Sequence, residues 1–179
     1  MRQTGGDAEV LLATRNGMAI RFKETDVREM GRSTTGVHGI KLKADDEVVG
    51  MELLEEGTTI LSATETGYGK RTNAKEYRTQ TRGGLGLINI KTGGRNGKVV
   101  GIAAVDETDE IMLISASGKL HRTAVKDIKT IGRNTMGVKF LDVGEGDKVV
   151  SLAKLAEKEA EINGGGAAEQ DAGPEEATE

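Results

Sequence analysis

Residues 9–22 read EVLLATRNGMAIRF, and this stretch decides the fold because it recurs twice more in the same chain. Residues 59–72 read TILSATETGYGKRT and residues 110–123 read EIMLISASGKLHRT, so the copies are 50 and 51 residues apart. In each copy an apolar run precedes a turn that ends in glycine, and a second expected strand follows the turn. Asn-Gly, the turn of the first copy, strongly predicts a hairpin because both residues accept positive φ. Repeats of this length are typical of arrays whose units bury their apolar faces against one another.

The rest of each repeat predicts two more strands after a polar link. The links cover residues 24–34, 73–82 and 124–134, with at most a short turn of helix. The expected strands are 36–42 with 47–53, 86–91 with 98–105, and 137–141 with 148–152. Four short strands per repeat, 26 glycines and a single proline favour a blade of antiparallel sheet. We therefore expect an all-β, propeller-like fold with three four-stranded antiparallel blades.

The predicted boundaries are residues 8–56, 57–107 and 108–155 for the three blades, and 156–179 for a tail. Three blades are too few for a closed ring, which typically has four to eight. An open array leaves unpaired sheet edges, which natural proteins usually avoid. The chain is therefore expected to be half of a ring or part of a longer array, and whether it folds alone or dimerises stays open.

Charge is unevenly distributed between the repeats and the tail. Residues 156–179 hold eight acids and one base, a net charge of −7, which leaves 24 bases and 21 acids, or +3, on residues 1–155. The tail is expected to be disordered because it has too little apolar content to fold. It is interpreted either as a solubilising appendage or as a polyanion that competes with another polyanion for the basic repeats.

Other features of the composition indicate a cytosolic protein. The chain has no cysteine, which excludes disulfides and thiolate metal sites. No stretch approaches the roughly 18 apolar residues of a membrane span, and no apolar signal segment follows Met1. His38 and His121 stand alone without metal-ligand spacing, and we expect no catalytic residue, metal or cofactor.

Two arginine columns recur in register. They are Arg21, Arg71 and Arg122 on the second hairpin strand, and Arg32, Arg82 and Arg133 in the links. Period-two alternation with Met18, Ile20 and Phe22 predicts that Arg21 points to solvent. With Lys70 and His121, the first column would form a basic stripe that suits phosphates through charge and bidentate geometry. The alternative interpretation is a plain solvated edge.

Several long strings resemble the C-terminal domain of bacterial DNA gyrase A. They are GYGKRT at 67–72, YRTQTRGGLG at 77–86, RNGKVVG at 95–101 and GRNTMGV at 132–138. The resemblance implies half of a six-bladed β-pinwheel whose blades exchange strands. It also implies wrapping of double-stranded DNA, in support of ATP-dependent negative supercoiling by a type IIA topoisomerase. The implied partners are the rest of gyrase A and, through it, gyrase B, in the bacterial cytoplasm at the nucleoid. Strand cleavage and ATP hydrolysis belong elsewhere in that enzyme, so this chain is expected not to be catalytic.

The resemblance and the columns together give the candidate DNA-binding residues: Arg21, Arg32, Lys70, Arg71, Arg82, Arg95, Lys98, Arg122 and Arg133. The family's seven-residue box has the pattern Gln, basic, Arg, Gly, Gly, basic, Gly. Here its echo consists of Gln80, Arg82, Gly83, Gly84 and Gly86. Thr81 and Leu85 replace both flanking bases, so we expect this chain alone to bind DNA weakly. The alternatives are a topoisomerase IV-type domain that bends DNA, and a kelch-type propeller that binds protein.

Overall fold

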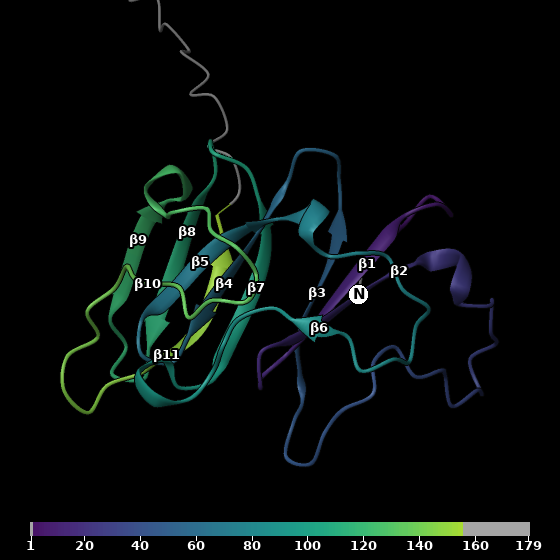
Figure 1. The fold of residues 1–179 in the computed structure, drawn as a ribbon, viewed down its shortest axis with the longest axis horizontal. Coiled ribbons are helices and arrows are strands. Elements are labelled where there is room, and N and C mark those ends of the chain that lie inside the picture. The colour runs from purple at the N-terminus through teal and green to yellow at the C-terminus, as the bar shows by residue number, and fades with distance from the viewer. Residues whose placement is uncertain (1, 156–179) are drawn as a thin grey trace, which may run out of the picture.

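The computed structural model describes residues 2–155, which form three antiparallel sheets joined by links and short 3₁₀ turns (Figure 1). The tail predicted at 156–179 lies outside the described residues. The strands are β1 Glu9–Thr14, β2 Met18–Lys23, β3 Val48–Leu54, β4 Thr59–Thr64, β5 Tyr68–Asn73, β6 Leu87–Ile88, β7 Val99–Val105, β8 Glu110–Ser115, β9 Leu120–Ala124, β10 Val138–Lys139 and β11 Val149–Lys154. The 3₁₀ turns are η1 Glu24–Asp26, η2 Ala74–Glu76, η3 Gly94–Asn96 and η4 Val125–Asp127. The all-β prediction is confirmed, and η1, η2 and η4 are the short helical turns expected in the links.

Neighbouring blades exchange strands. The first sheet has the order β3-β1-β2-β6 and the second the order β10-β5-β4-β7. β6 comes from the second repeat and β10 from the third, so the fourth strand of each of these blades belongs to the next repeat. The third sheet, β11-β8-β9, has three strands within the described residues. A blade is therefore complete only when another repeat follows it.

The prediction of a strand at 36–42 is wrong, because the described chain is irregular there. Its counterparts β6 and β10 are strands because each pairs with the hairpin of the preceding repeat. No hairpin precedes the first repeat among residues 2–155, so this segment has no ladder partner. The expected strands at 86–91 and 137–141 are also shorter than predicted, at two residues each.

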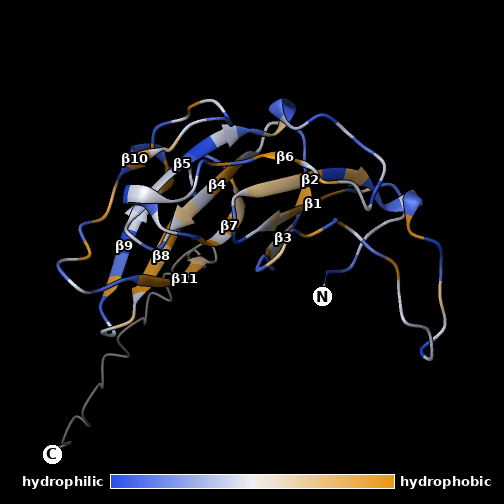
Figure 2. Cartoon of the chain, turned by 60° about the horizontal axis from the view of Figure 1, so that its bottom comes forward, coloured by the Kyte–Doolittle hydropathy of each residue, from blue (hydrophilic) through white to orange (hydrophobic). Residues whose placement is uncertain are grey.

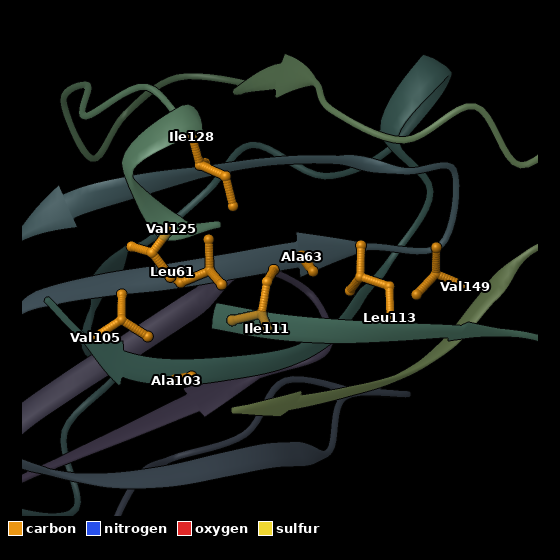
Figure 3. Close-up of a cluster of buried hydrophobic side chains, with 9 residues drawn as sticks. All are labelled: Leu61, Ala63, Ala103, Val105, Ile111, Leu113, Val125, Ile128 and Val149. Atoms are coloured by element: carbon orange, nitrogen blue, oxygen red, sulfur yellow. The ribbon is translucent and has the colours of Figure 1, made fainter. Parts of the chain in front are cut away.

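The core lies between the blades. Figure 3 shows one cluster in which side chains from β4 and β7 of the second sheet face β8 of the third. It consists of Leu61, Ala63, Ala103, Val105, Ile111, Leu113, Val125, Ile128 and Val149. A second cluster joins the first and second blades through Leu11, Ala13, Ala19, Ile60, Tyr77 and Ile102. Figure 2 shows the hydrophobic residues concentrated on strands such as β4 and β8, inside the stack. A third cluster, Val10, Ile20, Phe22 and Ile40, lies within the first repeat. Burial between repeats therefore stabilises the array together with burial within a repeat.

Candidate nucleic-acid interface

The sheets have an inner and an outer edge. β3, β7 and β11 lie at one end of their sheets and contact one another from blade to blade, which makes this the inner edge. The opposite ends carry β6, β10 and, in the third sheet, β9 (Figure 1). The links run along this outer edge, because parallel bridges join Arg21 to Thr79 and Arg71 to Thr130. Bases on the links are thus presented once per blade along the outside of the array.

The first arginine column joins consecutive repeats. Arg21 donates from Nη1 to the carbonyls of Ala74 (2.9 Å) and Tyr77 (3.1 Å), both in the second repeat. Its Nη2 pairs with Glu9, and this hydrogen bond holds the pKa of the Glu9 carboxyl below its ordinary value. Arg71 donates from Nε to the carbonyl of Ile128 in the third repeat, at 2.7 Å.

The prediction that this column points to solvent is wrong for two of its members. The side chains of Arg21 and Arg71 are 19% and 6% exposed, because the link of the next repeat covers them. Arg122 pairs with Glu110 on its own hairpin and is 47% exposed. No link follows Arg122 within the described residues, and this explains its exposure.

Lys70 is also a contact between repeats. It is fully buried, and its Nζ donates to the carbonyls of Gly132 (2.7 Å) and Arg133 and to Oγ1 of Thr135 (3.2 Å). Burial lowers the pKa of Lys70 to about 8, because desolvation disfavours the ammonium. The side chain is inaccessible to a phosphate in this structure, so we leave it out of the proposed DNA surface.

The second arginine column holds the links in place. Arg82 donates from Nε to the carbonyl of Asp26 (2.8 Å) and from Nη1 to that of His38 (3.0 Å). Arg133 makes the same pair of contacts one repeat later, to the carbonyls of Glu76 and Ile88. Both side chains are half-buried, which leaves each guanidinium partly accessible.

Three candidate bases from the sequence are open to solvent on the links and turns. Arg32 is exposed and forms no side-chain hydrogen bond or ion pair with the rest of residues 2–155. Arg95 is exposed on η3 and lies over the Tyr68 ring, 5.0 Å from its centroid, a cation–π contact that orients the guanidinium. Lys98 is exposed and donates from Nζ to Oδ1 of Asn16 at 2.5 Å. These residues stay predicted DNA contacts.

The box-like string at 80–86 joins the first and second repeats through backbone hydrogen bonds. The amide of Gln80 donates to the carbonyl of Arg21 (2.8 Å), and that of Gly83 to the carbonyl of Gly39 (2.6 Å). Gly86 has φ +74°, and a Cβ there would lie 2.4 Å from the carbonyl oxygen of Ala19. Glycine is required at this position both by the left-handed backbone and by the close approach. The carbonyl of Gly84 accepts the amide of Lys41 at 2.8 Å, so the glycines of the string serve backbone contacts.

A third basic column was missed by sequence reasoning. Arg28, Arg78 and Lys129 occupy one register, and all three are exposed. Within residues 2–155 their side chains form no hydrogen bond or ion pair. Arg78 and Lys129 directly precede Thr79 and Thr130, which bridge to the outer edges of β2 and β5. The signal is present in the sequence, since the three are separated by the same 50- and 51-residue steps. Strand alternation predicts which side chains are exposed only on the hairpin strands, and it makes no prediction for the links.

The described part of the chain offers no metal centre. Within residues 2–155, no three or more His, Asp and Glu side chains are grouped so that they could hold a metal ion. No helix in this part of the chain is long and apolar enough to cross a bilayer.

Comparison with known proteins agrees with this geometry. The chain matches the family model described as "DNA gyrase C-terminal domain, beta-propeller" in three consecutive segments, residues 8–55, 58–106 and 109–156. The A subunit of DNA gyrase from Haloquadratum walsbyi is 48% identical over 151 residues, which cover 83% of this chain and 18% of the relative. The Escherichia coli K12 protein of the same name is 47% identical over 154 residues, 86% of this chain and 18% of the relative. The chain therefore spans about a fifth of the length of these curated relatives.

Solved structures show the same fold. A structure of the DNA gyrase A C-terminal domain aligns with a TM-score of 0.79 and 34% identity over 86% of this chain and 52% of that one. The C-terminal domain of DNA topoisomerase IV aligns with a TM-score of 0.81 and 28% identity, over 86% of this chain and 48% of that one. The three family-model segments cover most of the chain, one repeat each, and the kelch-type alternative is not its family. This chain belongs to the family of DNA gyrase C-terminal domains.

Proposed function

We propose that this chain binds double-stranded DNA along the outer edge of its blades and bends it, without sequence preference. The observation that carries the proposal is the column of exposed bases Arg28, Arg78 and Lys129, which form no side-chain hydrogen bond or ion pair within residues 2–155. The links of Arg78 and Lys129 are bridged to the outer edge, and Arg28 has the same register in the first link. A regular series of cations suits a polymer with regularly spaced phosphates. Arg95 and Lys98 are further exposed bases that we assign to the same surface, and Arg32 and Arg122 belong to it in the single chain, where no neighbouring repeat engages them.

The half-buried and buried bases have a different role in this proposal. The links that carry the exposed column are held in place by hydrogen bonds from Arg21, Arg71, Arg82 and Arg133. Lys70 also holds the third link, because its Nζ donates to the carbonyl of Gly132. They fix the spacing of the phosphate contacts. Rigid spacing matters because bending DNA over a small protein costs on the order of several kcal/mol, which many backbone contacts must offset.

The wider role follows from the family. We infer that the chain contributes DNA wrapping to negative supercoiling by a type IIA topoisomerase, with the rest of gyrase A and with gyrase B as partners at the nucleoid in the cytoplasm. The identity of the curated relatives as A subunits of DNA gyrase supports this proposal. Bending without strong wrapping, as in the topoisomerase IV-type alternative, is the second candidate. It is favoured by Thr81 and Leu85, which replace the bases of the box.

The test is a titration of a short labelled duplex with the 179-residue chain, followed by fluorescence anisotropy at several salt concentrations. The triple variant R28Q/R78Q/K129Q removes the exposed column. If each base neutralises one phosphate, the slope of log affinity against log salt should become shallower by about 0.9 per base, or nearly 3 in total. Affinity should fall similarly for duplexes of unrelated sequence.

The matched control is R2Q/K148Q/K154Q, which removes the same charge near the inner strands. Arg2 pairs with Glu52 on β3, Lys148 precedes β11, and Lys154, at the end of β11, pairs with the buried Asp109 at 2.7 Å, so the folding of this variant is checked by circular dichroism before the titration. This variant should keep the salt slope of the parent chain. Equal slopes for the two triple variants would mean that only net charge matters and would overturn the proposed outer track. Salt-insensitive or sequence-selective binding would overturn backbone recognition as a whole.

A further inference from the structure

Each contact between repeats has a donor half and an acceptor half. The donor is the short strand that begins after a left-handed glycine, β6 after Gly86 and β10 after Gly137. The acceptor is the outer edge of the preceding hairpin, where Leu87 lies opposite Ala19 and Val138 opposite Gly69. Three repeats make two such contacts, so one donor and one acceptor remain unused among the described residues.

The unused acceptor is the edge of β9. Gly118, in its turn, has φ +84°, the same backbone as Gly17. A Cβ on Gly17 would meet the carbonyl oxygen of Ile90 at 2.2 Å, whereas a Cβ on Gly118 has nothing within 4 Å. Leu120, which begins β9, is 64% exposed. The turn of this edge thus has the backbone of an occupied acceptor, and no donor strand lies on the edge within residues 2–155.

The unused donor is the segment that follows Gly36. Gly36 has φ +80°, as Gly137 has, yet no atom lies within 4 Å of its ideal Cβ, whereas a Cβ on Gly137 would lie 2.5 Å from the carbonyl oxygen of Gly69. Val37 has no partner strand, and its amide donates no hydrogen bond within residues 2–155. Arg32, whose counterparts Arg82 and Arg133 reach carbonyls of the preceding repeat, is exposed. The glycine that begins the donor segment thus already has the left-handed backbone of its paired counterparts.

We propose that two copies of this chain associate head to tail into a closed ring, each adding its donor segment to the β9 edge of the other. The register of the internal contacts places Val37 opposite Leu120 and His38 opposite Lys119. Arg122 then donates to the carbonyls of Glu24 and Val27 of the second copy, the counterparts of the carbonyls that Arg21 uses.

Two copies are the number that closes the ring. One chain covers 52% of the solved gyrase A C-terminal domain, so two supply six repeats, the length of one such domain. A two-fold arrangement uses the donor–acceptor contact twice and leaves no donor or acceptor unused. The inference concerns assembly and does not depend on DNA binding, so experiments on the DNA-free chain test it separately from the proposed function.

The first experiment measures the mass of the DNA-free chain by light scattering and sedimentation across the micromolar range. The expected species has twice the 18.9 kDa of one chain. A monomer throughout this range would overturn the proposal, and so would larger open polymers.

Proline variants then test each half of the contact. The carbonyl of Lys119 accepts the amide of Ser115 on β8, so strand alternation turns the amide of Leu120 to the open side. L120P therefore removes an edge amide and spares the β8–β9 ladder, a position where proline is tolerated. V37P removes the donor amide on the other half. Each should weaken dimerisation at least about tenfold, the equivalent of one net hydrogen bond. The matched controls L120V and V37T keep the amides and should dimerise like the parent chain.

Disulfide trapping tests the register without relying on either proline variant. The chain has no cysteine, so V37C and L120C can be introduced singly. Paired antiparallel residues have Cα atoms about 5.5 Å apart, within disulfide range. An equimolar mixture of V37C and L120C under mild oxidation should give a covalent dimer, and each variant alone should not. A dimer from one variant alone, or none from the mixture, would overturn the head-to-tail contact.

Discussion

Replacing Arg71 with methionine should separate a structural role of the first arginine column from a DNA-binding one. Methionine keeps most of the apolar stem and removes the guanidinium, so packing changes little. The change removes the 2.7 Å hydrogen bond from Nε to the carbonyl of Ile128, at a side chain only 6% exposed. A net hydrogen bond from a charged donor contributes about 1.5–3 kcal/mol, and a buried carbonyl that loses its donor costs in the same range. R71M should therefore lower the free energy of unfolding by about 2–3 kcal/mol.

R122M is the matched control, because Arg122 occupies the same register without a following link. Its side chain is 47% exposed and pairs with Glu110 on its own hairpin. Exposed ion pairs contribute about 0–1 kcal/mol, so R122M should change the free energy of unfolding by no more than that. Its accessible guanidinium belongs to the proposed DNA surface, so R122M should instead weaken DNA binding and make the salt slope shallower by about 0.9.

The assay is urea unfolding followed by far-UV circular dichroism, with both substitutions made in the L120P chain, whose dimerisation is weakened, so that association contributes little. Anisotropy titrations on the same two variants give the DNA affinity. A stable R71M that binds DNA as weakly as R122M would refute the proposal that the buried members of the column act between repeats. Equal destabilisation by both variants would refute the idea that exposure distinguishes them.

Four further outcomes are expected. L85K, at a side chain that is 52% exposed, should add one phosphate contact and steepen the salt slope by about 0.9 in an anisotropy titration. Removal of residues 156–179, with their net charge of −7, should tighten DNA binding at low salt in a gel-shift assay, and an unchanged affinity would leave the tail as a solubiliser. The pKa of Lys70 is about 8 in the folded chain against an ordinary 10.5, so the unfolded state binds more protons between these values. The free energy of unfolding should therefore rise by about 1 kcal/mol from pH 7 to pH 9 relative to K70M, as urea titrations at both pH values would show. G137A should lower the melting temperature more than G36A does: both have φ +80°, but only Gly137 would place a Cβ 2.5 Å from a β5 carbonyl, which adds a clash to a strain of about 1–2 kcal/mol.

The hairpins could be predicted because their determinants are local. Gly17, Gly67 and Gly118 each have positive φ in the turn, and the strands on either side pair in the expected register. Turn chemistry and strand alternation act within about a dozen residues, which a single sequence displays directly. The number of repeats and the all-β class follow from the same signal.

Strand exchange could not be predicted from the residues in the same way. Gly36, Gly86 and Gly137 occupy one register and share a left-handed backbone, yet only the last two lead into strands. Whether such a segment becomes a strand depends on the presence of a preceding hairpin, and this is a property of its position in the array. Alternation likewise showed which side of β2 carries Arg21, but not that a link from the second repeat covers that side.

Recurrence of a residue in every repeat has two distinct physical causes, and the terminal repeats distinguish them. A residue that contacts the next repeat is buried wherever a neighbour follows and exposed only at the end, as Arg21, Arg71 and Arg122 are in turn. A residue that faces an external partner is exposed in every repeat, as Arg28, Arg78 and Lys129 are. In a repeat protein the exposure along a column, rather than its recurrence, therefore identifies candidate contacts with a partner. For this chain that criterion moves the proposed phosphate track from the hairpin strands to the links, where a change of charge is least coupled to folding.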